Sequence, residues 1–219
     1  MAASSPSPPA KYGALLSAFS FYGAYHADVV NQRIHAVFVP AILGSALLFA
    51  TQVPLRVPPA AAAALGLPAA AAAAVVSAAD VAAPAYALYY VVLTARGGLP
   101  LVGLGAGAGV IALWRGASAL VAARGFAAVW RPALALHVAS WLAQFYGHGV
   151  HEGRAPALLD NLFQALVTAP LFVFVEGLFA AGLLKDFKRA SDAEVAKLLA
   201  KFRAGMAGAG GGGAAAGAK

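Results

Sequence analysis

Residues 34–53, IHAVFVPAILGSALLFATQV, decide the fold. The stretch contains no Asp, Glu, Lys or Arg, and about twenty apolar residues are the length that an α-helix needs to cross the hydrocarbon core of a bilayer. Backbone N–H and C=O groups cannot be left unpaired against lipid, so a segment of this kind is helical. The stretch therefore predicts a transmembrane helix that ends before Pro54 and Arg56.

The composition of the whole chain points the same way. Its 219 residues are 62% hydrophobic and 11% charged, with a mean hydropathy of +0.78, whereas soluble domains are about half apolar and a quarter charged. A soluble domain of this length does not have enough core to bury so much apolar surface. Four further apolar stretches follow: residues 68–93, 99–121, 132–146 and 162–184. We expect an all-α, polytopic membrane helical bundle with four to five transmembrane helices and short flanking amphipathic helices, one of them over residues 13–25.

The net charge of +7 does not indicate a nucleic-acid partner. Seven of the fifteen Lys and Arg residues lie in the last 35 residues, and the others are scattered singly without a basic stripe or interleaved aromatic side chains. Basic residues after a hydrophobic span mark its cytoplasmic side. We therefore expect a membrane domain over residues 11–187 and a cytoplasmic tail over 188–219, with a short helix over 190–202 capped by Ser191 and a Gly/Ala-rich disordered end. Residues 1–10 are also expected to be disordered.

All five histidines fall in two clusters at the ends of apolar stretches, at residues 25–35 and 137–152. Polar side chains at membrane depth are costly and mark functional sites, and the absence of cysteine excludes thiolate ligands. Imidazoles beside carboxylates and amides suit iron, which non-haem Fe(II) enzymes hold with positions open for substrate and oxygen. His26 and His35 would point in opposite directions on one helix, so a shared site requires a bend between them.

The second cluster leaves two arrangements open. His137 and His148 share one helix face but lie about 16.5 Å apart along a continuous helix, while each metal–nitrogen distance is only about 2 Å. Either Gly147 and Gly149 break the helix, or the two histidines serve different centres. His148 and His151 have a spacing that allows them to share a metal without distortion.

Two blocks, YHADVVNQRIHAVFVPAIL at residues 25–43 and WLAQFYGHGVHEGRAPALLDNLFQALVTAPLFVFVEGLF at 141–179, resemble the Mpo1-like family. The shared pattern is Y-H-x4-N-x3-H-x-x-F-V-P followed by W-x-x-Q-F-x-G-H-x3-E-x-R-x-P-A-L. The resemblance covers nearly all of residues 12–185, with the middle matching only in hydropathy. It implies a multi-pass endoplasmic reticulum membrane protein of lipid and sphingolipid metabolism, an Fe(2+)-dependent oxidoreductase that uses O2 to shorten 2-hydroxy long-chain fatty acids by one carbon in an α-oxidation step, as in phytosphingosine degradation.

The resemblance also implies roles for single residues. Four histidines occupy the positions of essential histidines, expected to be catalytic and to bind the metal: His26, His35, His137 and His148. Five further motif positions carry second-shell or substrate-orienting roles: Asn31, Gln144, Glu152, Asp160 and Asn161. His151 stands where the family is commonly apolar or aromatic, which speaks against a ligand role.

Roles are also expected for three residues outside this set. The carboxyl of Glu176 lies within an apolar stretch, where a second-shell role and a helix-packing hydrogen bond remain open. Arg33 or Arg154 could pair with the substrate carboxylate.

Other classes remain open on the residues alone. Paired histidines on different spans can ligate haem, so the alternative is a haem- or metal-binding membrane electron carrier, or a transporter, without dioxygenase activity. A membrane desaturase is excluded because its histidine boxes need about eight histidines, and this chain has five.

Overall fold

The computed structural model describes residues 12–153 and 162–211, apart from residues 57, 65, 67 and 69–74. In chain order the elements are α1 Gly13–Ala24, α2 Val29–Ala50, β1 Pro54–Arg56, α3 Pro59–Ala64, β2 Val75–Ser77, α5 Ala78–Arg96, α6 Pro100–Arg124, α7 Phe126–Tyr146, the π-helix η1 Gly147–Glu152, α8 Leu162–Ala180 and α9 Lys185–Gly211. Helices carry nearly all of the described regular structure, so the predicted all-α class is confirmed. The small antiparallel pair β1–β2 was not predicted.

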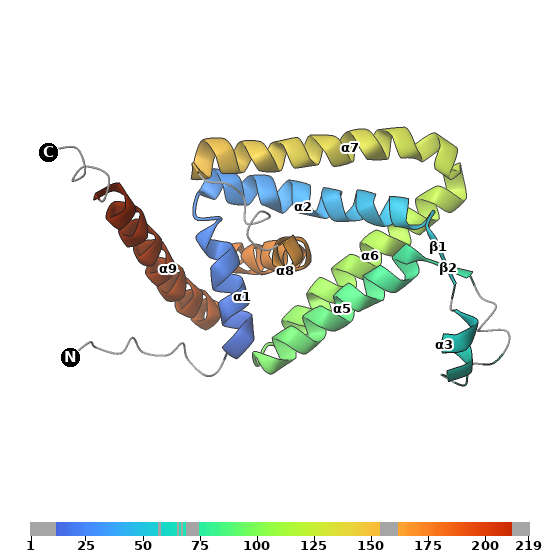
Figure 1. The fold of residues 1–219 in the computed structure, drawn as a ribbon, viewed down its shortest axis with the longest axis horizontal. Coiled ribbons are helices and arrows are strands. Elements are labelled where there is room, and N and C mark those ends of the chain that lie inside the picture. Colours follow the sequence, from blue (N-terminus) through green and yellow to red (C-terminus); the bar gives the residue numbers. More distant parts are fainter. Residues whose placement is uncertain are drawn as a thin grey trace, which may run out of the picture.

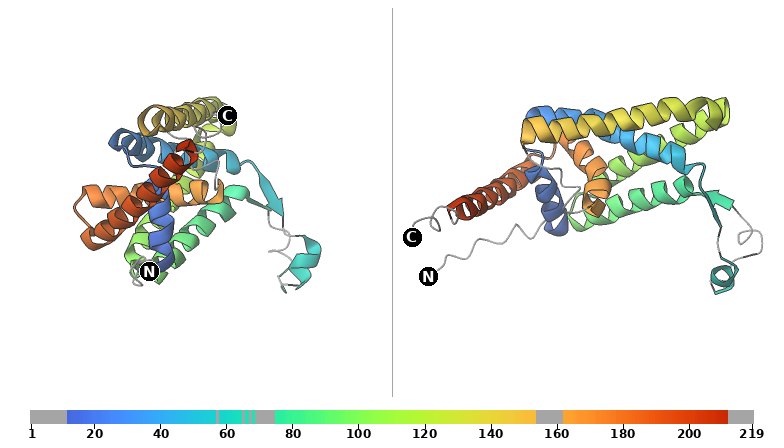
Figure 2. Two further views of the ribbon diagram at one scale, coloured as in Figure 1. Left: turned by 60° about the vertical axis from the view of Figure 1, so that its left-hand side comes forward. Right: turned by 45° about the horizontal axis from the view of Figure 1, so that its top comes forward.

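Two antiparallel helix pairs build the body of the molecule. Helices α2 and α7 lie side by side in one layer, and the consecutive helices α5 and α6 form a hairpin beneath it (Figure 1). Helices α1 and α8 pack across one end of both pairs, while α9 contacts α1 and extends away from the rest of the bundle, as the right view of Figure 2 shows. The main core lies where α1, α2, α5 and α8 meet, around Leu16, Tyr90 and Phe172.

Three described helices, α2, α5 and α6, are long and apolar enough to cross a membrane. Segments Leu166–Ala180 and Lys185–Ala204 meet the same requirement together but are bent by 119°, and they make a fourth span if the bent pair counts as one. The predicted membrane bundle is confirmed, but the described residues give three candidate spans, or four with the bent pair, against the four to five expected. Helix α7, which contains the predicted apolar stretch 132–146, is not among them.

Glycines allow α5 and α6 to approach closely. A Cβ at Gly103 would lie 2.1 Å from Thr94 Oγ1 and 2.5 Å from the carbonyl oxygen of Tyr90, and one at Gly107 would lie 3.1 Å from Ala87 Cβ. Small residues are common at helix contacts in membranes, because they let the backbones approach closely. Lipid tails are as apolar as leucine side chains, so burying large apolar side chains between helices gives no hydrophobic stabilisation there.

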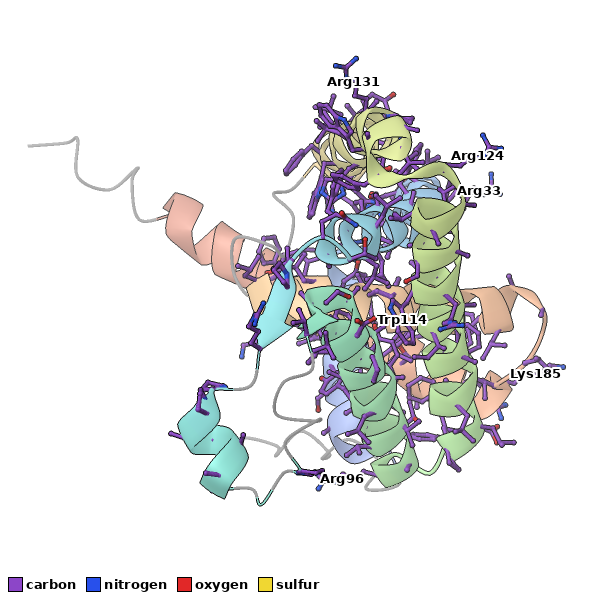
Figure 3. The ribbon with its side chains drawn as sticks, turned by 90° about the vertical axis from the view of Figure 1, so that its right-hand side faces the viewer. Arg33, Arg96, Trp114, Arg124, Arg131 and Lys185 are labelled. Carbon is purple, nitrogen blue, oxygen red and sulfur yellow. The ribbon has the colours of Figure 1, made fainter. Side chains whose placement is uncertain are left out.

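Helix α5 begins at Ala78, so the predicted span from residue 68 is wrong at its start. Ser77 and Asp80 form a capping box: Ser77 Oγ accepts a bond from the Asp80 N–H (3.3 Å), and Asp80 Oδ2 accepts one from the Ser77 N–H (2.7 Å). Trp114, which lies in the middle of the α5–α6 hairpin in Figure 3, also donates to Asp80 Oδ1. The reciprocal bonds satisfy the backbone donors that a helix start leaves open.

The prediction for the tail also needs correction. Gly182 (φ 75°) and Leu184 (φ 54°) reverse the chain after α8, and α9 begins directly after this turn. Ser191 is therefore a buried residue inside α9 and not its N-cap. Phe187 packs its ring against Phe19 of α1, with ring centroids 5.3 Å apart. Residues 1–10, expected to be disordered, lie outside the described part of the chain.

Candidate metal centre

Three of the four predicted ligands come together in the interior. One ring nitrogen from each of His26, His35 and His148 lies within 4.8 Å of the other two, and the three side chains are only 2–3% exposed. His26 precedes α2, His35 lies in the second turn of α2, and His148 belongs to η1. Three convergent buried imidazoles form a group that can bind a metal ion.

The expected bend between His26 and His35 is present at Asp28. This residue has an extended backbone (ψ 131°) and caps α2, because its Oδ1 accepts bonds from the N–H groups of Val30 (2.8 Å) and Asn31 (3.0 Å). The side chain of Gln32 donates to the carbonyl oxygen of His26 at 2.8 Å and closes the turn. The N-cap thus folds His26 back over the first turns of the helix.

Backbone carbonyl groups orient the rings of His26 and His35. Nδ1 of His26 lies 2.8 Å from the carbonyl oxygen of Tyr22, and Nδ1 of His35 lies 2.9 Å from that of Asn31. A carbonyl oxygen only accepts hydrogen bonds, so each Nδ1 carries the proton and each neutral ring has its lone pair on Nε2. Metal-binding histidines are commonly held in this way, so the donor set fits a metal.

Glu152 ties η1 to the start of α2. Its Oε1 accepts bonds from the Asp28 N–H (2.8 Å) and from Asn31 Nδ2 (3.1 Å). A Cβ on Gly147 would lie only 2.3 Å from Asn31 Oδ1, so glycine is what lets η1 sit so close to α2. Two of the residues predicted to support the site, Asn31 and Glu152, therefore hold the segment that carries His148.

The sequence left open whether the helix breaks at Gly147 and Gly149 or whether His137 and His148 serve different centres. The α-helix changes to a π-helix at Gly147. The wider turns of η1 run to Glu152 and stop at Gly153, which has a left-handed backbone (φ 62°). Short π-helical turns are frequent at functional sites. His148 reaches the group through this segment, and the structure does not bring His137 into it.

His137 lies deeper along α7, with both ring nitrogens engaged. Trp141 Nε1 can only donate, and it lies 3.0 Å from His137 Nε2, which therefore accepts. His137 Nδ1 lies 2.8 Å from Ser45 Oγ, which itself donates to the carbonyl oxygen of Ala41 at 2.6 Å. Nδ1 is thus the donor, and the Nε2 lone pair is occupied by the indole.

An apolar pocket of about 340 Å³ connects the three histidines with His137. Besides these histidines its described lining comes from α1, α2, α5, α7 and α8, and includes Tyr22, Val39, Tyr86, Trp141, Gln144 and Pro170. Cavities of a few hundred Å³ with few polar groups are typical of sites for small apolar ligands. Gln144 Nε2 is buried and has no hydrogen-bond partner among the residues that the structure describes.

The remaining predicted residues lie elsewhere. His151 is outside the histidine group, with Nδ1 3.9 Å from Asp28 Oδ1. Glu176 on α8 does not line the pocket. Arg33 is exposed at the periphery (Figure 3) and is not among the described pocket residues. Arg154, Asp160 and Asn161 lie outside the described residues.

Sequence reasoning missed two residues of this region. Tyr22 stacks its ring on His26, with centroids 4.0 Å apart and planes within 3°, and burial raises the pKa of its phenol, which therefore stays protonated. Its position four residues before His26 on a helical segment was the available signal. Ser45 was visible as a polar residue inside an apolar span.

Comparison with known proteins gives the family of the chain. The family model described as 2-hydroxy-palmitic acid dioxygenase Mpo1-like matches residues 13–180. The chain belongs to the Mpo1-like family. Within the Mpo1-like family it is similar to 2-hydroxy-palmitic acid dioxygenase MPO1 of Saccharomyces cerevisiae, with 33% identity over 176 residues that cover 80% of this chain and 85% of the yeast protein. No solved structure matches the chain.

Proposed function

We propose that this Mpo1-like protein is an Fe(II)-dependent dioxygenase that shortens 2-hydroxy fatty acids by one carbon in the endoplasmic reticulum membrane, with its C-terminus in the cytoplasm. The observation that carries the proposal is a buried group of three histidines at one end of an apolar pocket. The printed name of the yeast relative supports the substrate class.

The donor set fits iron. Three neutral imidazoles leave further coordination positions for a chelating substrate and for oxygen, as in non-haem Fe(II) enzymes. Iron held by His26, His35 and His148 would supply Lewis acidity and oxygen activation. The requirement for a 2-hydroxyl group follows, because a 2-hydroxy acid can bind through two oxygens.

The chain itself positions the substrate and keeps water out. The apolar lining of the pocket takes the acyl chain, and burying each methylene is worth about 0.8 kcal/mol. Gln144 Nε2 donates to a carboxylate or hydroxyl oxygen of the substrate, since an unpaired buried amide is costly. The protonated phenol of Tyr22 offers a second donor along the same pocket.

The test is product analysis with purified protein, ferrous iron, oxygen and 2-hydroxyhexadecanoic acid. We expect oxygen uptake that depends on the acid and a product one carbon shorter. His35→Ala should remove both activity and bound iron, whereas the matched control His151→Phe, which changes a histidine outside the group, should keep both. Turnover by a triple alanine variant of His26, His35 and His148 would refute the proposal, and a Soret band in the purified protein would favour the haem-binding alternative.

A further inference from the structure

The structure contains a second, mostly apolar cavity that shares helices α2 and α7 with the histidine pocket. It has a volume of about 700 Å³, and its described lining comes from α2, α6 and α7 and includes Ser45, Leu48, Ala133 and Leu136. Ser45 lines this second cavity and His137 lines the first. Their hydrogen bond of 2.8 Å therefore stands between the two spaces.

Two stripes of side chains run from the histidine group to this bond. On α2 the pocket is lined at positions 35, 39, 42 and 46, with Leu43 beside them, and on the antiparallel α7 and η1 at 148, 144, 141 and 137, with Phe145 beside them. Each stripe has the spacing of a single helix face. From His35 to Ser45 the chain advances about 15 Å, and from His148 to His137 about 16.5 Å, at 1.5 Å per residue. The two helices thus give nearly the same pocket length.

We propose that the His137–Ser45 pair, held by Trp141, is the end wall of the acyl pocket and sets the longest chain that the enzyme accepts. The geometry rests on two bonds: the indole fixes the imidazole from one side, and the serine hydroxyl fixes it from the other. His137 is then a specificity-determining residue and not a metal ligand. The inference rests on the proposed function only in naming a 2-hydroxy acid as the occupant.

The length of the pocket converts into a number of carbons. Single bonds of about 1.5 Å at near-tetrahedral angles advance an extended chain by about 1.25 Å per carbon, so 15–16.5 Å holds about twelve or thirteen carbons. With the carboxyl carbon and the 2-carbon at the histidine group, the whole acid has about 14–15 carbons. A longer acid would have to bend or displace the imidazole of His137.

The experiment measures binding and turnover separately for saturated 2-hydroxy acids of 14, 16, 18, 20 and 22 carbons. Binding is read by native mass spectrometry of the full-length protein in detergent, and turnover by product analysis with ferrous iron. We expect the wild-type protein to prefer the 14- and 16-carbon acids, which bracket this limit, over the longer ones. His137→Ala joins the two cavities, and the ratio of 20-carbon to 16-carbon binding should rise about 80–250-fold, since each of the four additional methylenes accepted into an apolar cavity gains a factor of about three to four. Bound metal should stay at the wild-type level.

Two further variants keep the test decisive if His137→Ala folds poorly. Ala46→Leu adds bulk at the far end of the first pocket, where Ala46 is part of the lining, and should shift the preference to shorter acids. Ala133→Leu fills the second cavity, and it should change nothing alone but cancel the gain when combined with His137→Ala.

Three results would overturn the inference: equal binding of 16- and 22-carbon acids by the wild-type protein, an unchanged profile in all variants, or loss of metal in His137→Ala. A protein that binds acids with this length limit but turns none over would refute the proposed function and leave the end wall supported.

Discussion

Gly147→Ala tests whether the close seat of η1 on α2 holds the histidine group together. The added Cβ would lie 2.3 Å from Asn31 Oδ1, at least 0.7 Å inside the 3.0 Å that real Cβ contacts respect. The far neighbour, Ile34 Cδ1, is at 3.3 Å and gives little room on the other side. Either η1 or the side chain of Asn31 has to move.

Both movements disturb the metal centre. If Asn31 turns away, its Nδ2 bond to Glu152 is lost, and if its backbone shifts, the carbonyl that orients His35 moves with it. Overpacking of this kind costs about 1–3 kcal/mol, and loss of groups that orient metal ligands typically weakens metal binding about 10–100-fold. We expect a lower melting temperature in detergent and a metal affinity reduced by one to two orders of magnitude.

Gly149→Ala is the matched control, because it adds the same methyl group to the same π-helix where a Cβ meets nothing within 4 Å. The assay is a pair of measurements on each purified variant: thermal unfolding, and metal content after titration against a chelator. Equal metal affinity and stability in the two alanine variants would refute the reasoning.

Three other predictions follow from local contacts. Gly103→Ala forces a Cβ to within 2.1 Å of Thr94 Oγ1 and should lower the free energy of unfolding by about 1–3 kcal/mol. Gly109→Ala is the control, because its Cβ meets nothing within 4 Å and should leave the stability unchanged. Equal melting curves of the two variants would contradict this prediction. Gln144→Leu keeps the bulk of the side chain but removes the unpaired amide donor, so KM for the 2-hydroxy acid should rise about tenfold with metal content unchanged, as steady-state kinetics and metal analysis would show. Ser77→Ala removes the N-cap of α5 and should cost about 1 kcal/mol in chemical unfolding; a loss of activity larger than the loss of folded protein would contradict a purely structural role.

Hydropathy predicts the helices of this chain because lipid allows few alternatives, yet it misplaces several helix starts, among them those of α5 and α9. Residues 60–76 are as apolar as the helix that follows, so the break at Ser77 leaves no mark in hydropathy. It is visible only as a capping pattern. At α9 the deciding residues are Gly182 and Leu184, which both have a left-handed backbone. Glycine adopts this conformation readily, whereas the local preference of a leucine is against it.

At the site, too, the sequence does not reveal contacts between residues that are far apart along the chain, as the histidines show. His26, His35 and His148 were predicted together with His137, since all four stand in matching motif positions. What separates His137 from the rest is its bond to Ser45, 92 residues away in sequence. No spacing rule within one cluster can predict a partner from another helix.

The same register of α2 against α7 sets both ends of the acyl pocket. At the metal end, η1 continues α7 and is held to α2 by the Glu152–Asn31 bond; at the far end, His137 meets Ser45. A slip of α7 by one residue would rotate every one of its pocket side chains by about 100°, so the two bonds can form only in one register. The distance between metal and end wall is therefore fixed by rigid helices and not by loops, and a change in chain-length preference requires a change in the side chains at positions 45, 46, 137 or 141.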